Sequence, residues 1–214
     1  MKDETSGKFI PYLIGLLALI LIFNQIQISS VSGMNTAESS SNVKLSAVNV
    51  IPTGIPKIYG QELGVSYDDV SVRNQRKADE TISKLGNLDV KIELSSQELQ
   101  RYINIASKIS CEYCCGAQSI IFSNGQAACG CAHSYAMRGV AKYMIKYHSS
   151  EFTDDQILEE LGKWKTLFFP GNIQKKAQIL NDKGIELNYI NLASNKYRGI
   201  EQGAASGGAM VGGC

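Results

Sequence analysis

The sequence predicts a mainly α protein, in which an N-terminal transmembrane helix precedes a small domain of three to four helices with a Cys/His-rich loop. Three observations support this fold class. Residues 9–28 form an uncharged apolar run, apolar side chains recur at helical spacing after two capping motifs, and five of the six cysteines fall within residues 111–131.

The apolar run of residues 9–28 (FIPYLIGLLALILIFNQIQI) has the length of about 20 residues that crosses a bilayer as a helix. It also resembles the apolar core of a signal peptide, but no clear Ala-x-Ala cleavage site follows, which favours an uncleaved signal anchor. Lys2 and Lys8 precede the run, and no Lys or Arg follows before Lys44. By the positive-inside tendency residues 1–8 then stay in the cytoplasm. The prediction is a single-pass membrane protein whose C-terminal domain lies outside the cytoplasm.

The rest of the chain divides into three parts by composition. Residues 29–69 begin with a Ser/Asn/Thr/Gly-rich stretch and continue with Pro and Gly punctuation, which predicts a flexible stalk and then an extended segment that lies on the domain. Residues 70–194 form the compact domain, and residues 195–214 form a Gly-rich flexible tail that ends in Cys214. The formal net charge of +1 argues against nucleic acid as a partner, because phosphate-binding domains carry a basic excess.

Capping motifs and apolar spacing predict the helices of the compact domain. Ser95-x-x-Glu98 is a capping box that opens a first helix. A second helix begins near Cys129 or Cys131, where one apolar stripe starts, and a third begins at Thr153 and stops at residues 170–171 (Pro-Gly). A weaker helix over residues 173–181 and a short strand over residues 185–192 complete the domain.

The cysteines of residues 111–131, together with a histidine, form the pattern C-x2-C-C-x13-C-x-C-x-H. Two short clusters of soft donors separated by a loop are typical of a tetrahedral metal site, to which each cluster contributes two ligands. Zinc needs four ligands, so the excess also suits Cu(I) or a small thiolate-bridged cluster. The first-choice ligands are Cys111, Cys114, Cys129 and His133, with Cys115 and Cys131 as alternates or additional thiolates.

Two other uses of these thiols stay open. In the first, Cys111 and Cys114 are the catalytic pair of a thiol-disulfide oxidoreductase that acts on a thiol-containing partner protein. In the second, the cysteines form disulfides that stabilise a binding module, as is common outside the cytoplasm. The favoured prediction is a membrane-anchored protein that binds zinc or Cu(I), and whether it is an enzyme stays open.

The order of several short motifs resembles the CcmH-type thiol-disulfide domain of cytochrome c maturation. The matching pieces are CEYC (111–114), QSI (118–120), SN (123–124), TDDQI (153–157) and FFP (168–170). This resemblance implies a membrane-tethered three-helix domain whose C-x-x-C faces the extracytoplasmic side, with Cys111 and Cys114 as the redox pair. The additional donors are similar to those of the PCYCGC-type lipoproteins, which are small Cys-rich extracytoplasmic domains.

Overall fold

The structure is a computed structural model that describes residues 49–202 and 210–213. Within these residues the chain is helical and contains no β-strand, which confirms the predicted mainly α class. The same residues form seven α-helices, two of them very short, where three to four were expected. No helix of this part is both long and apolar enough to cross a membrane, and the predicted transmembrane segment 9–28 lies outside it.

Two capping boxes begin helices where the sequence predicted them. The Ser95 hydroxyl accepts the N–H of Glu98, whose carboxylate accepts the N–H of Ser95, and Thr153 and Gln156 repeat this exchange. The elements in chain order are α2 (Tyr59–Leu63), η2 (Tyr67–Asp69), α3 (Gln75–Lys91), α4 (Ser96–Ala106), α5 (Ala132–Tyr147), α6 (Asp154–Phe168), α7 (Pro170–Asp182), α8 (Tyr189–Ala193) and η3 (Asn195–Tyr197).

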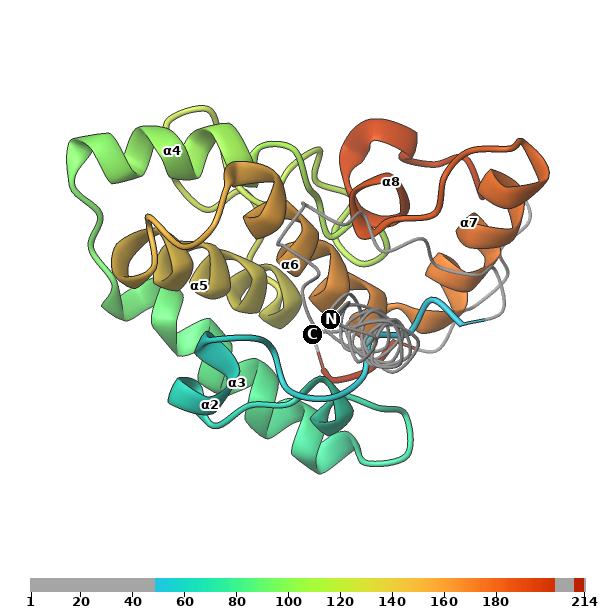
Figure 1. The fold of residues 1–214 in the computed structure, drawn as a ribbon, viewed down its shortest axis with the longest axis horizontal. Helices are drawn as coiled ribbons and strands as arrows, with labels where there is room; N and C mark the ends of the chain where they lie inside the picture. The colour runs from blue at the N-terminus through green and yellow to red at the C-terminus, as the bar shows by residue number, and fades with distance from the viewer. Residues whose placement is uncertain (1–48, 203–209, 214) are drawn as a thin grey trace, which may run out of the picture. The chain divides into compact units, whose positions relative to one another are not determined.

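Helix α5 lies at the centre of the domain. It packs most extensively on α3 and also contacts α4 and α6, so that α5 and α6 lie between α4 and α3 (Figure 1). The contact with α3 depends on Gly139, since a Cβ atom there would lie 2.0 Å from the carbonyl oxygen of Leu85. The close approach buries the apolar side chains of both helices in one core.

The segment predicted to lie on the domain as an extended chain, up to residue 69, packs into this core but forms α2 and η2. Tyr59 and Tyr67 are buried, and their hydroxyls donate to the same Glu160 carboxylate oxygen at 2.7 and 2.5 Å. Trp164 in turn donates its indole N–H to the Tyr59 hydroxyl at 2.8 Å. These buried polar contacts attach the segment to α6.

The C-terminal part also departs from the prediction. The strand expected over residues 185–192 is a loop followed by α8, because Asn188 caps a helix by accepting the N–H of Asn191 at 2.8 Å. In the predicted flexible tail, residues 195–197 form η3, and Val211 is fully buried. The Val211 N–H donates to the Phe168 carbonyl at 2.9 Å, so residues 210–213 are docked on the end of α6.

Candidate metal centre

A long loop, residues 107–131, carries the cysteines from the end of α4 to the start of α5. Its first half is held by the segment after α8. Asn195 accepts the Ser110 hydroxyl at 2.7 Å and donates to the Gln118 carbonyl at 2.9 Å, and Arg198 donates to the carbonyls of residues 116 and 117. Most of these contacts satisfy loop carbonyls, so the loop is fixed without regular secondary structure.

Arg138 of α5 holds the second half of the loop. Its side chain is 1% exposed and forms a 2.7 Å ion pair with Asp89 of α3. The same guanidinium donates to the carbonyls of Ile120 and Cys129 at 3.1 and 2.9 Å. Arg138 therefore holds the cysteine loop against α3 and α5, and its charge is neutralised by the buried Asp89 carboxylate.

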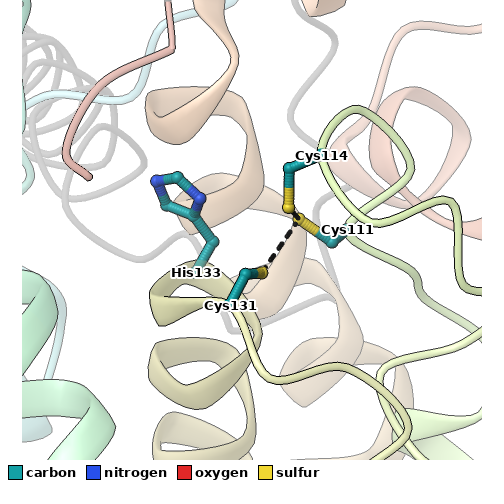
Figure 2. Close-up of side chains that lie close together, drawn as sticks. All are labelled: Cys111, Cys114, Cys131 and His133. Carbon is teal, nitrogen blue, oxygen red and sulfur yellow. Dashed lines mark hydrogen bonds between the residues drawn. The ribbon is translucent and has the colours of Figure 1, made fainter. Parts of the chain in front are cut away.

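Four side chains of this loop and of α5 converge on one point. One donor atom from each of Cys111, Cys114, Cys131 and His133 lies within 4.8 Å of the other three. Figure 2 shows Cys111 and Cys114 approaching from the loop, and Cys131 and His133 at the beginning of α5. The Cys111 sulfur is 3.0 Å from that of Cys114 and 3.4 Å from that of Cys131. Three sulfurs and one imidazole nitrogen are a donor set that zinc accepts.

Two aromatic rings and a backbone carbonyl hold the imidazole of His133 in place. The ring is fully buried and packs on Phe168 and Phe169, with ring centroids 4.7 and 5.0 Å apart. Its Nε2 lies 2.8 Å from the carbonyl oxygen of Val211. Since a carbonyl only accepts, Nε2 donates this hydrogen bond, and Nδ1 is the ring nitrogen that remains for a metal. Metal-binding histidines are commonly held by such a backbone carbonyl.

Two of the predicted metal ligands are bonded to each other in the structure. Cys115 and Cys129 form a disulfide, so their sulfurs do not act as thiolates in this state. The sulfur of Cys129 lies 3.5 Å from that of Cys131, and a second group of four donors, Cys114, Cys115, Cys129 and Cys131, also lies within 4.8 Å. Cys131, predicted as an alternate, thus takes the place in the first group that the sequence gave to Cys129. Cys214 lies outside the described residues.

Two thiols of the first group, the buried Cys111 and the half-buried Cys131, differ in acidity. The pKa of Cys131 is lowered to about 3, because hydrogen bonds from the Cys111 thiol, His133 and Ser134 stabilise its thiolate and outweigh the effect of burial. The pKa of Cys111 is raised, since its proton is shared with Cys131 and its sulfur is buried. Cys131 is also the N-cap of α5, where its sulfur accepts the N–H of Ser134 at 3.4 Å.

A network of buried charges lies directly beneath the C-x-x-C segment. Glu112 has a positive φ of 64°, and its carboxylate accepts Lys165 at 2.7 Å, Lys176 at 3.3 Å and the N–H of Gly199 at 2.7 Å. Glu201 completes the network, since it lies 3.4 Å from Lys176. Both lysines and both carboxylates are at most 1% exposed at their side chains. The two positive and two negative charges balance one another.

Burial has opposite consequences for the pKa values in this network. It lowers the pKa of Lys165 to about 8, although the Glu112 carboxylate works against this effect. For Glu112 itself, burial would raise the pKa, but Lys165 and Lys176 outweigh it and leave the pKa lowered. Glu112 is therefore charged at neutral pH and attaches the first cysteine pair to α6 and α7.

This network was not predicted, although one of its lysines leaves a recognisable pattern in the sequence. In α7, Lys176 lies between Ile173, Ala177 and Leu180 at the spacing of a single apolar face. A lysine inside an apolar stripe indicates a buried charge that needs a partner. By contrast, nothing in the local sequence indicates that Val211 would reach His133, which lies 78 residues earlier.

Comparison with protein-family models, curated proteins and solved structures finds no match for this chain.

Proposed function

We propose that this protein is a membrane-anchored metal-binding protein that holds zinc or Cu(I) at Cys111, Cys114, Cys131 and His133. One observation carries the proposal: the four donor atoms lie within 4.8 Å of one another. Zinc bonds of about 2.0–2.3 Å place tetrahedral ligands about 3.5–3.8 Å apart, so the sulfurs need to move by less than about 1 Å. Soft thiolates also suit Cu(I).

The bound ion would join the two ends of the cysteine loop. Cys111 and Cys114 follow α4, whereas Cys131 and His133 begin α5. A metal at this point crosslinks elements that are otherwise connected by residues 115–130, and its binding free energy adds to the stability of the domain. The predicted anchor at residues 9–28 would place this site outside the cytoplasm, at the surface of the membrane. There the ion is either a structural element or cargo.

Metal analysis of the full-length protein, purified in detergent without chelator, tests the proposal. The expected result is about one zinc or copper ion per chain that stays bound through gel filtration. Replacing both Cys111 and Cys114 with serine should abolish binding of this ion. A folded protein that contains no metal and retains neither added Zn²⁺ nor added Cu(I) would contradict the proposal.

A second candidate function is thiol-disulfide exchange by Cys111 and Cys114, with a thiol-containing partner protein. The observation in its favour is the 3.0 Å separation of the two sulfurs, together with the exposure of Cys114. An exposed thiol beside a buried one is the arrangement of an attacking and a resolving cysteine. If this candidate is correct, Cys111→Ser traps a mixed disulfide through Cys114, and the purified protein lacks metal.

The docked segment 210–213 provides a prediction about His133. At Gly212, which has a φ of +80°, a Cβ atom would lie 2.3 Å from Cδ1 of Ile82. Gly212→Ala is therefore expected to displace the segment and to withdraw the Val211 carbonyl from His133. Loss of such a partner lowers metal affinity about 10- to 100-fold. Competition with a chromophoric zinc chelator measures this change.

Gly213→Ala is the matched control, because a Cβ atom at Gly213 meets nothing within 4 Å. It should bind zinc as the unmodified protein does. Equal zinc affinity in the two variants, with α-helical circular dichroism unchanged, would show that the segment does not orient the imidazole.

A further inference from the structure

The two groups of four donors in this cluster overlap. The first consists of Cys111, Cys114, Cys131 and His133, and the second of Cys114, Cys115, Cys129 and Cys131. Together they use every sulfur of residues 111–131 and the one imidazole, and they share Cys114 and Cys131. A shared pair of thiolates between two sets of four is the arrangement that two tetrahedral ions need when two sulfurs bridge them.

The spacing of the sulfurs fits such an arrangement. Cys111 lies 3.0 Å from Cys114 and 3.4 Å from Cys131, and Cys131 lies 3.5 Å from Cys129. Ligands of one tetrahedral zinc ion lie about 3.5–3.8 Å apart, so these sulfurs are already close to the separations within a cluster. A two-ion cluster also explains why residues 111–133 contain more donor side chains than one ion can bind.

Charge does not oppose a second ion. Three thiolates around one Zn²⁺, with a neutral imidazole, carry one net negative charge. Five thiolates around two Zn²⁺ carry the same net charge, because the second ion neutralises the two thiolates that it adds. The Lys165 ammonium, which interacts with Cys111, therefore faces the same net charge in both states.

The Cys115–Cys129 disulfide decides whether the second ion has its ligands. As a disulfide, these two sulfurs are neutral and bonded to each other, so the second group keeps only the shared Cys114 and Cys131. Cys129 is buried but Cys115 is exposed, so a reducing thiol can reach the bond from the Cys115 side.

We infer that the redox state of the Cys115–Cys129 disulfide sets the metal capacity of the cluster: one ion when the disulfide is intact, and two thiolate-bridged ions when it is reduced. In the reduction a dithiol transfers two electrons and two protons to the disulfide and leaves as a disulfide itself. The second Zn²⁺ then displaces the protons of Cys115 and Cys129 as it binds. This inference rests on the proposed function, because the first ion occupies the site described above.

Zinc stoichiometry in the two redox states tests the inference. Full-length Cys214→Ser protein, in which the thiol of the C-terminal residue is removed, is saturated with Zn²⁺ without reductant and, separately, after anaerobic reduction by a phosphine. Excess metal is removed by gel filtration before elemental analysis. The expected result is about one zinc per chain without reductant and about two after reduction. The matched variant Cys115→Ser/Cys129→Ser should retain about one under both conditions.

The outcomes separate this inference from the proposed function. One zinc ion per chain in both redox states overturns the inference and leaves the proposed function intact. No retained zinc in either state overturns the inference, and it overturns the proposed function as well if added Cu(I) is not retained either. A second zinc ion that persists in Cys115→Ser/Cys129→Ser also overturns the inference, since that ion binds elsewhere. The redox comparison uses the wild-type loop, so the test does not depend on the folding of the double variant.

Discussion

Replacing Cys131 with serine is expected to lower the zinc affinity about a hundred- to a thousand-fold and to leave the fold unchanged. A structural zinc site binds with about 10–16 kcal/mol, so each of four ligands contributes about 2.5–4 kcal/mol on average. Cys131 also caps α5 by accepting the N–H of Ser134. Serine is among the preferred N-caps, so the variant removes the metal ligand and keeps the cap. Chelator competition measures the affinity, and circular dichroism measures the helix content.

Two histidines of the domain provide a matched control for the same site. His133→Gln should weaken zinc binding as Cys131→Ser does. His148→Gln should leave zinc binding unchanged. His148 is also buried, but it contacts Glu62 and Glu151 instead of the cysteines. Equal zinc affinity in Cys131→Ser and the unmodified protein would exclude Cys131 as a ligand.

The second large effect is expected in the buried charge network. Glu112→Gln should lower the free energy of unfolding by about 3–5 kcal/mol, the usual cost of removing one partner from a buried ion pair. After the substitution Lys176 keeps its ion pair with Glu201, whereas Lys165 loses its carboxylate partner and keeps the Ala193 carbonyl. Denaturant titration of the full-length protein, followed by the fluorescence of the buried Trp164, measures the change.

Two further variants test whether this loss comes from an uncompensated charge. Glu80→Gln breaks an exposed pair with Arg76 and should change stability by less than about 0.5 kcal/mol. Adding Lys176→Met to Glu112→Gln removes one excess cation, so the double variant should be more stable than Glu112→Gln alone. A double variant less stable than either single variant would contradict this account.

The parts of the fold that local chemistry determines could be predicted from the sequence. The capping boxes at Ser95 and Thr153 lie where the structure has them, since a hydroxyl and a side-chain acceptor three residues apart need no distant partner. The cysteine pattern likewise identified the loop whose donors converge. Helix α3 was not predicted, because its sequence is mostly polar and its packing depends on the close approach of Gly139 of α5.

The division of roles among the cysteines could not be predicted for a different reason. Spacing along the chain shows that Cys129 and Cys131 both lie near the start of a helix, but the geometry of the loop decides which of them reaches Cys115. That geometry is set by Arg138 and Asn195, whose contacts span up to 88 residues. Contacts of this length have no periodic signal in the sequence.

The docking of residues 210–213 against His133 sets an order of assembly during synthesis. The cysteine loop and α5 leave the ribosome about 70 residues before Val211, so they emerge without the carbonyl that fixes the imidazole. Until that residue arrives, the imidazole of His133 lacks its backbone acceptor. The proposed site is therefore completed only after α8 has been made, and a chain that ended after α8 would lack the carbonyl that fixes the imidazole.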